Sequence, residues 1–214
     1  MKGKIKKEFA IIFDFDGTIA NTSAYWKDIF NELSREFKFR KVNDENWGRL
    51  KGENTKNFYK EMNIPLSRIP AIMDKATKIF ARKAKSIKPI AGMVKVLNTF
   101  KNKGHKLGIL TSNRKENVED FLRNNNLNLF DFIYSENDLF GKDKAMKRII
   151  KKEDLNIRKV FYVGDEDRDI KAAKKAGVKV IAVTWGSCSE KILLKEKPDF
   201  LAKAPKDLNL IFKT

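Results

Sequence analysis

The stretch FAIIFDFDGTIA, Phe9–Ala20, decides the fold that the rest of the chain must adopt. Its apolar run at residues 9–13 predicts a buried strand. Asp14 and Asp16 follow, and two carboxylates at the edge of an apolar core repel each other unless a cation lies beside them. Gly17 comes next and permits a tight backbone turn. A plain Asp-Gly turn is the simple alternative, but carboxylates delivered to a glycine turn also suit a metal-bound nucleophile at the carboxyl end of a parallel strand.

The composition is that of a folded protein rather than a disordered one. Hydrophobic residues make up 42% and aromatic residues 11% of the 214 residues, enough for one core domain with a modest insertion. The single cysteine, Cys188, excludes an internal disulfide framework and fits a reducing compartment. Acidic residues interrupt the N-terminal apolar run too early for a signal peptide, and no stretch has the length of a membrane span. We therefore expect a cytoplasmic monomer or homodimer with no membrane partner.

The net charge of +18 raises the question of a nucleic-acid partner. The lysines are spread along the chain, with a small cluster only at residues 2–7. No recognisable nucleic-acid module and no regular alternation of aromatic and basic residues occurs. We expect a solvated lysine-rich surface, which would also attract small phosphorylated molecules. A nucleic-acid-binding protein on the same fold remains an alternative.

The region after the first strand has a helical pattern. Apolar residues recur at three- and four-residue spacings in residues 23–37, and residues 54–62 and 65–85 also have helical patterns. No strand pattern occurs from there to about residue 88. The sequence therefore predicts a helical cap domain at residues 21–85 and a core domain at residues 1–20 and 86–214.

From Pro89 onward the pattern changes to alternating helices and strands. Helices are predicted at residues 93–103, 116–124, 144–152 and 170–176. Strands are predicted at residues 106–110, 132–134, 160–163 and 178–183, followed by a short strand near Phe200 and a terminal helix. This alternation predicts an α/β fold with a doubly wound, Rossmann-like parallel sheet and a helical cap inserted after the first strand.

Further polar stretches come after predicted strands, at the same sheet edge as Asp14 and Asp16. Thr111, Ser112 and Asn113 offer hydroxyl, amide and backbone donors that can hold phosphate oxygens, although such a run can also be a simple helix cap. A lysine beside the carboxylates would let a dianionic phosphate approach. The stretch GKDK, residues 141–144, supplies Lys142, with Lys144 as the rival.

The stretch VGDEDRDI, residues 163–170, adds two more carboxylates, Asp165 and Asp169. Hard oxygen ligands of this kind suit Mg²⁺, which shares its coordination shell with waters and a phosphate. An acidic helix start is the simpler explanation for one such residue. Four aspartates at strand ends are difficult to explain as independent caps.

Taken in order, DFDGT, LTSN, a lysine and VGDEDRDI followed by AAKKAGVKVIAVTWG resemble the haloacid-dehalogenase-like hydrolase superfamily, and within it the phosphoglycolate phosphatase-like branch. The resemblance covers nearly the whole chain. It implies an enzyme, a Mg²⁺-dependent phosphatase that hydrolyses a small phosphorylated metabolite, with phosphoglycolate as one model for the substrate. A sugar phosphomutase of the same family is the nearest alternative.

The resemblance also implies a role for each matching residue. Asp14 would be the nucleophile that forms an aspartyl-phosphate, and Asp16 the general acid and then base. Mg²⁺ would be held by Asp14, the backbone carbonyl of Asp16, and Asp165, with Asp169 as a ligand or support. The residues expected at the phosphoryl group and substrate are Thr111, Lys142, Gly17, Thr18, Ser112 and Asn113.

The sequence departs from the family pattern at the lysine, which is often followed by proline there and is followed by Asp143 here. This leaves Lys142 and Lys144 both open. In the cap, Lys51 lies in a stretch that resembles a substrate-facing loop, and we expect it to meet a substrate anion. Cap residues vary with substrate, so the substrate itself is not readable.

The remaining conspicuous residues receive simpler interpretations. We expect His105, the only histidine, to lie on the surface, and Cys188 to be a small apolar filler. Trp26 and Trp47 belong to the cap core or to the wall of a substrate pocket. Trp185 is expected at an interface or in packing.

Overall fold

The apolar run after Phe9 forms β1 (Ala10–Phe13), and all four of its side chains are buried. The computed structural model describes residues 8–83, 86–136 and 141–212. The further strands in that part of the chain are β2 (Lys106–Thr111), β3 (Phe132–Ser135), β4 (Val160–Gly164), β5 (Lys179–Val183) and β6 (Phe200–Ala202). They pair in parallel in the order β3-β2-β1-β4-β5-β6. The order reverses beside β1, where an open α/β sheet leaves a crevice for ligands.

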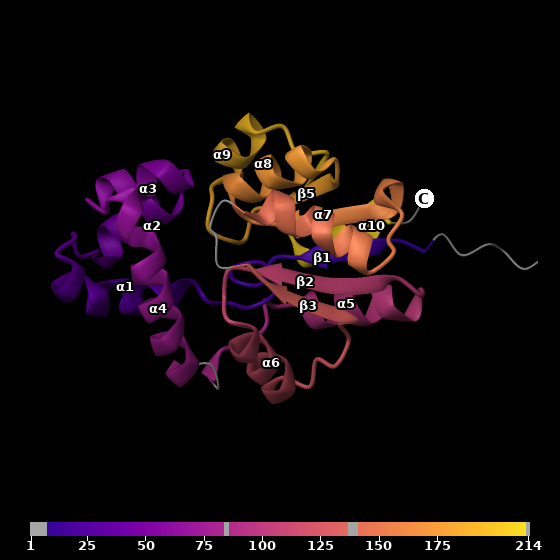
Figure 1. The fold of residues 1–214 in the computed structure, drawn as a ribbon, viewed down its shortest axis with the longest axis horizontal. Helices are drawn as coiled ribbons and strands as arrows, with labels where there is room; N and C mark the ends of the chain where they lie inside the picture. The colour runs from indigo at the N-terminus through magenta and orange to yellow at the C-terminus, as the bar shows by residue number, and fades with distance from the viewer. Residues whose placement is uncertain (1–7, 84–85, 137–140, 213–214) are drawn as a thin grey trace, which may run out of the picture.

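Helices cover both faces of this sheet (Figure 1). One face packs against α5 (Met93–Asn102), α6 (Lys115–Asn124) and α10 (Pro205–Ile211). The other packs against α7 (Lys142–Lys152), α8 (Asp167–Ala176) and α9 (Glu190–Lys195). The alternation along β1 explains both cores, because Ile11 and Phe13 join the first and Ala10 and Ile12 join the second. The predicted doubly wound α/β fold is confirmed.

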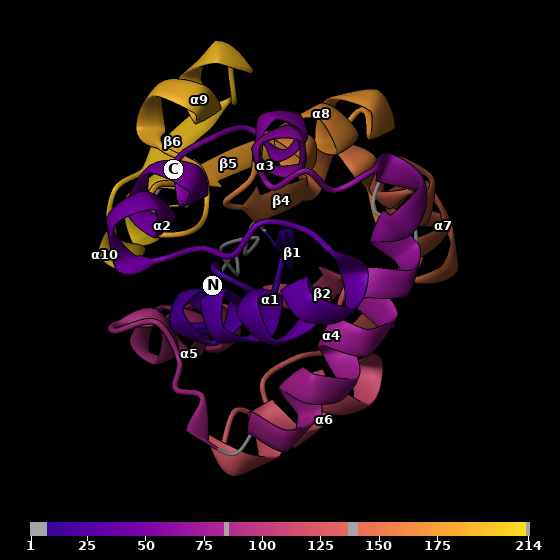
Figure 2. The same cartoon turned by 90° about the vertical axis from the view of Figure 1, so that its left-hand side faces the viewer.

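Between β1 and the rest of the sheet, the chain forms a helical segment, residues 21–83, that we call the cap segment. It contains α1 (Ser23–Phe37), α2 (Asp44–Lys51), α3 (Thr55–Glu61), the short 3-10 helix η1 (Leu66–Arg68) and α4 (Ile69–Lys83). These helices stand beside one end of the sheet in Figure 1 and in front of it in Figure 2. The division into a cap domain and a core domain at the proposed boundaries stays a prediction.

Several helices differ from the sequence-based expectation. α2 and α9 were not expected, nor was the 3-10 helix η3 (Ile157–Lys159). α7 begins at Lys142 rather than Lys144, and α8 begins at Asp167 rather than Ile170. The first turns of α7 and α8 carry buried charged side chains, which interrupt the apolar periodicity from which a helix is recognised.

The prediction that His105 lies on the surface is wrong, since the residue is only 5% exposed. Its ring packs against those of Phe9, Phe100 and Phe212, with centroids 5.5 to 5.9 Å apart. Its Nδ1 accepts a hydrogen bond from the backbone N–H of Phe9 at 3.3 Å. Burial lowers the pKa of His105. The terminal helix α10 closes over the ring, and this long-range packing is absent from the local sequence.

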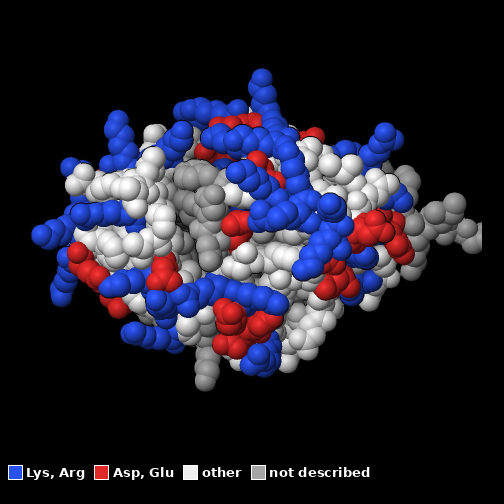
Figure 3. Space-filling model, in the orientation of Figure 1, with Lys and Arg blue, Asp and Glu red and all other residues white. Residues whose placement is uncertain are grey.

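The surface carries the large positive charge in a dispersed form. Figure 3 shows Lys and Arg over the whole visible face, with Asp and Glu between them. Many of these charges are paired at the surface, for example Lys101 with Asp131 at 2.6 Å. This face therefore fits the expected solvated surface better than a single basic track. Among the residues described, none of the helices is long and apolar enough to cross a membrane.

Candidate active site

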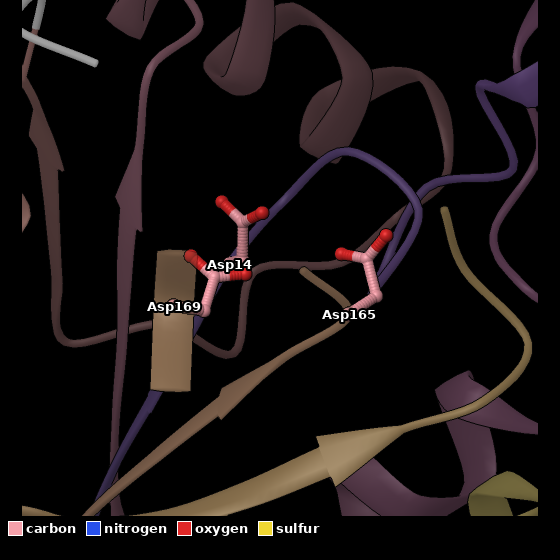
Figure 4. Close-up of side chains that lie close together, drawn as sticks. All are labelled: Asp14, Asp165 and Asp169. Carbon is pink, nitrogen blue, oxygen red and sulfur yellow. The ribbon is translucent and has the colours of Figure 1, made fainter. Parts of the chain in front are cut away.

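Three aspartate side chains meet at the carboxyl ends of the central strands (Figure 4). Asp14 directly follows β1, Asp165 directly follows β4, and Asp169 lies in the first turn of α8. One carboxylate oxygen from each lies within 4.8 Å of the others. All three residues are buried, Asp165 and Asp169 completely. Such a group repels itself strongly unless positive charge offsets it.

Lys142 supplies part of that positive charge from the first residue of α7. Its Nζ lies 3.0 Å from Asp14 Oδ1 and 2.7 Å from Asp169 Oδ1, and it donates to the Tyr162 hydroxyl at 3.0 Å. The side chain is only 2% exposed. Burial lowers the pKa of Lys142, but attraction to the two aspartates outweighs it, so the pKa lies well above its ordinary value. Lys144, the rival from the sequence, is exposed.

Asp165 is held by neutral donors rather than by a cation. Its Oδ1 accepts from the Thr18 hydroxyl at 2.8 Å, and its Oδ2 accepts from the backbone N–H of Ser187 at 2.6 Å. Thr18 is therefore engaged beneath the site and fully buried. Gly17 adopts φ of +76°, and a Cβ there would lie 2.5 Å from Asp165 Oδ2. The turn between the aspartates and the cap segment thus requires glycine for both its conformation and its closeness.

Gly164 has a similar role at the end of β4. A Cβ on this residue would lie 2.5 Å from Asp169 Oδ2. Because Gly164 has no side chain, the carboxylate of Asp169 can pack directly against the end of β4. The Glu166 backbone N–H donates to the same oxygen at 3.2 Å, which fixes the orientation of Asp169.

The donor set fits a hard divalent cation. Burial is the largest cause that raises the pKa of Asp14, and repulsion from Asp169 and Asp165 adds to it, against the attraction of Lys142. Burial also raises the pKa of Asp165 to about 7, with repulsion from Glu166 and Asp169. One ammonium therefore does not fully offset three carboxylates. Oxygen ligands in this number and closeness match what Mg²⁺ takes from proteins, so these residues could hold a metal ion.

Asp16 stands apart from the cluster and faces the cap segment. Its Oδ1 accepts from the indole Nε1 of Trp26 at 3.2 Å, and its Oδ2 accepts from Asn113 Nδ2 at 3.1 Å. Burial raises the pKa of Asp16 to about 6, while these hydrogen bonds oppose the rise. A carboxyl group with such a pKa can both donate and accept a proton near neutral pH, as an acid–base catalyst must.

The run at the end of β2 lies beside these aspartates. The Thr111 hydroxyl accepts from the backbone N–H of Asn113 at 2.9 Å, so it is oriented from within its own turn. Asn113 is fixed in turn by Asn117, whose Nδ2 donates to Asn113 Oδ1 at 2.8 Å. The buried Ser112 Oγ has no hydrogen-bond partner among the described residues. The Ser112 hydroxyl, and the Thr111 hydroxyl proton, can donate to phosphate oxygens at this edge.

A cleft of about 1030 Å³, open mouth included, lies between this sheet edge and the cap segment. Its lower side presents Asp14, Asp16, Gly17, Thr111, Ser112 and Asn113. From the cap side it is lined by Trp26, Phe30, Trp47, Leu50, Phe58, Tyr59 and Met73. Because the cleft joins the buried aspartates to the exterior, a substrate can reach Asp14 there.

Comparison with known proteins agrees with this geometry. The family model for haloacid dehalogenase-like hydrolases matches residues 11–183. The chain belongs to the haloacid dehalogenase-like hydrolase family. The match runs from β1 to the end of β5 and so includes all the aspartates of the site. The family predicted from the sequence motifs is confirmed.

Relatives in this family have phosphatase names. A phosphoglycolate phosphatase from Synechococcus elongatus is 27% identical over 200 residues, covering 93% of this chain and 94% of that protein. A phosphoserine phosphatase from Methanocaldococcus jannaschii is 27% identical over 225 residues, covering 97% and 98%. These relatives confirm the predicted enzyme class, a phosphatase of the haloacid dehalogenase-like family.

Solved structures of the family share the fold. A haloacid dehalogenase-like hydrolase from Streptococcus pneumoniae aligns with a TM-score of 0.80 at 20% identity, covering 98% of this chain and 100% of that one. A predicted phosphatase from Clostridium acetobutylicum aligns with a TM-score of 0.81 at 20% identity, covering 97% and 100%. At this identity they establish the architecture of the haloacid dehalogenase-like fold in this chain.

The sequence did not reveal every contact of the site. Trp26 was expected in the core or in a pocket wall, but not as a donor to Asp16. Tyr162 accepts from Lys142 and donates to the Leu110 carbonyl at 3.2 Å. A tyrosine in a buried strand needs a partner for its hydroxyl, and this signal could have pointed to the site. The side chain of Lys51, at the end of α2, lies outside the described part of the structure.

Trp185, Trp47 and Cys188, three residues for which the sequence suggested simple structural roles, all line the cleft. Trp185 lines the cleft, and its indole Nε1 donates to the Thr18 carbonyl at 3.2 Å. Trp47 also lines the cleft, which agrees with its predicted place in the wall of a pocket rather than in the cap core alone. Cys188 is buried, as expected for a small filler, and burial raises the pKa of its thiol. A thiol kept protonated in this way is a poor nucleophile.

Proposed function

We propose that the protein is a Mg²⁺-dependent phosphatase that hydrolyses a small phosphorylated metabolite through an aspartyl-phosphate on Asp14. The observation that carries the proposal is the buried Asp14–Lys142–Asp169 arrangement, whose Asp14 lines the same cleft as Asp16. A nucleophilic carboxylate, a fixed cation and a separate acid–base group are the parts that this reaction needs.

In the first step, a carboxylate oxygen of Asp14 attacks the phosphorus and the bond from phosphorus to the ester oxygen breaks. Protonated Asp16 gives its proton to that departing oxygen, which leaves as the alcohol. Lys142 favours the ionised form of Asp14 and orients its carboxylate, since its Nζ lies 3.0 Å from Oδ1. Thr111, Ser112 and Asn113 support the phosphoryl oxygens at the end of β2.

In the second step, Asp16 is a carboxylate and takes a proton from water. The water oxygen attacks the phosphorus of the aspartyl-phosphate, and the bond to Asp14 breaks to release inorganic phosphate. Asp16 is suited to both steps because Trp26 and Asn113 hold its two oxygens in place while its pKa stays near neutrality. Each turnover returns both aspartates to their starting states.

Asp14, Asp165 and Asp169 would hold Mg²⁺, together with the backbone carbonyl of Asp16 that the family resemblance implies. Bound there, the ion supplies positive charge that lets a phosphate dianion approach the carboxylates. Asp169 also anchors Lys142, and Thr18 and Ser187 orient Asp165, so the protein fixes its ligands in advance.

The names of the relatives do not agree on one substrate. They include phosphoglycolate phosphatase, phosphoserine phosphatase and, from Bacillus mycoides, pyrophosphatase PpaX. A phosphoglycolate-like substrate therefore stays a prediction from the sequence.

Release of inorganic phosphate from p-nitrophenyl phosphate tests the proposed function. We expect turnover with Mg²⁺, loss of turnover after chelation, and recovery when Mg²⁺ is restored. Asp14→Asn should abolish turnover and leave the circular dichroism spectrum unchanged. Activity that survives chelation would reject the metal. Conversion of a sugar phosphate to its isomer without phosphate release would instead indicate the phosphomutase.

A further inference from the structure

The cap side of the cleft presents a row of apolar side chains opposite the proposed phosphate site. Five of the described cap residues that line it are polar, namely Asn21, Thr22, Ser23, Glu53 and Thr55, and seven are aromatic or aliphatic: Trp26, Phe30, Trp47, Leu50, Phe58, Tyr59 and Met73. We call these seven apolar residues the apolar wall. Several of them keep part of their surface exposed to the cleft, including Trp26, Trp47 and Phe58. An exposed aromatic wall gains stability when an apolar group covers it.

The rings of the apolar wall support one another. Trp26 contacts Phe30 with centroids 6.1 Å apart, Phe30 contacts Phe58 at 5.5 Å, and Phe58 contacts Trp47 at 6.3 Å. Trp26 also stacks on Phe80 at 5.7 Å, which ties the row into the cap core. A wall fixed by such contacts needs little ordering when a ligand arrives.

The charged residues of the cleft argue against a second anionic group on the substrate. Besides Asp14 and Asp16, the described lining residues include Glu53 and Glu166. The only cationic residue among the described lining residues is Arg168, and it already donates to Glu166, with Nη2 3.1 Å from Oε1. A substrate carboxylate would therefore meet carboxylates rather than an uncommitted cation.

The apolar wall begins next to the leaving oxygen. Asp16 is the group that protonates this oxygen in the proposed function, and Trp26 donates a hydrogen bond to Asp16 at 3.2 Å. The substituent on the leaving oxygen would therefore start near Trp26. From there the linked rings lead to Trp47.

From these observations we propose that the substrate is a phosphate monoester of an uncharged, apolar alcohol, whose organic group packs on the apolar wall. The inference rests on the proposed function, since it takes Asp14 and Asp16 as the reacting groups. It departs from a phosphoglycolate-like substrate, whose leaving group carries a carboxylate. Lys51 remains the rival determinant, and the experiment includes it.

The test compares three esters with Mg²⁺ present: benzyl phosphate, ethyl phosphate and 2-phosphoglycolate. All three esters release a primary alcohol, so their demand for protonation by Asp16 is similar. Covering the apolar wall with a phenyl ring should make kcat/KM for benzyl phosphate roughly ten- to a hundredfold higher than for ethyl phosphate. We expect 2-phosphoglycolate to be the poorest of the three.

Variants locate the preference on the apolar wall. Trp47→Ala should lower the benzyl-to-ethyl ratio by at least roughly threefold, whereas Trp47→Phe should largely keep it. Leu66→Ala is the matched control, because Leu66 is an apolar cap residue that is 56% exposed and does not line the cleft. Its ratio should equal that of the unmodified protein. The ratio in the unmodified protein decides the question even if Trp47→Ala does not fold.

Two results would overturn the inference alone. A benzyl-to-ethyl ratio near one would mean that the apolar wall does not contact the leaving group. Preferred hydrolysis of 2-phosphoglycolate, lost in Lys51→Ala, would assign the cap side to an anion. Absence of hydrolysis with all three esters and with p-nitrophenyl phosphate would overturn the proposed function itself, and the inference with it.

Discussion

Replacing Lys142 by methionine removes the ammonium that contacts Asp14 and Asp169 while keeping an unbranched side chain of similar length. At an effective dielectric constant of about 20, the contact at 3.0 Å is worth about 5.5 kcal/mol of attraction and that at 2.7 Å about 6 kcal/mol. Most of this attraction offsets the cost of burying the charges. Removing one partner of such a buried group lowers the free energy of unfolding by about 3–5 kcal/mol, because the remaining carboxylates are still buried but no longer have a cation beside them.

We therefore expect Lys142→Met to lose about 3–5 kcal/mol in the free energy of unfolding, measured by urea denaturation in the absence of Mg²⁺. Its kcat for p-nitrophenyl phosphate with Mg²⁺ should fall at least roughly a hundredfold, because a preorganised charge at the reacting groups is lost. Lys144→Met is the matched control, since Lys144 lies two residues after Lys142 on the same helix and is exposed. It should change the free energy of unfolding by less than about 0.5 kcal/mol.

The reasoning would be refuted if Lys142→Met kept its turnover within about twofold of the unmodified protein. It would also be refuted if Lys144→Met were the damaging substitution, because the charge that matters would then reside two residues further on. A loss of turnover with no loss of stability would show that the carboxylates protonate when Lys142 is absent. In that case the worked magnitude would be wrong although the catalytic role stands.

Three further predictions follow from single groups. Asp16→Asn should give a burst of about one nitrophenolate per active site with p-nitrophenyl phosphate, followed by a slow steady state. The reason is that hydrolysis of the aspartyl-phosphate on Asp14 then lacks its general base. Rapid-quench kinetics would measure the burst, and a linear time course would contradict the prediction. For an alkyl phosphate, kcat/KM should fall as pH rises above about 6, the pKa of Asp16, since only protonated Asp16 can protonate the leaving oxygen. For p-nitrophenyl phosphate, kcat/KM should fall less over the same pH range. Identical pH profiles for the two substrates would argue against Asp16 as the general acid. The lowered pKa of His105 means that the unfolded chain takes up its proton first as pH falls. The stabilising contribution is present above the unfolded pKa of about 6.5 and is lost as pH falls through the folded value, so the free energy of unfolding should fall less between pH 7 and 5 in His105→Gln than in the unmodified protein.

The order of the strands along the chain and the residues at their ends could be predicted from the amino-acid sequence alone. The run before Asp14 predicts a buried strand from apolar content alone, and the later alternation of periods predicts parallel pairing. Parallel strands bring their carboxyl ends to one edge, so Asp14 and Asp165 were expected at the same edge although 151 positions separate their numbers. Local patterns suffice for this because strand direction fixes the edge at which a side chain arrives.

Tertiary structure decided which neighbours those side chains have. Lys142 and Lys144 are equal in the sequence, and only the packing of α7 on the sheet buries one and exposes the other. The contact of Trp26 with Asp16 depends on how the cap segment closes over the sheet edge. His105 is covered in part by Phe212, the residue that directly follows α10, about a hundred residues later in the chain.

The apolar wall is the clearest case of a feature that belongs to the tertiary structure. Its rings come from three helices, α1, α2 and α3, and α2, which carries Trp47, was not predicted from the sequence. Periodicity identifies a side chain that must leave water, but it does not say whether another protein group or a ligand covers it. Only the packing of three helices beside one sheet edge brings Trp26, Phe58 and Trp47 to line the same cleft.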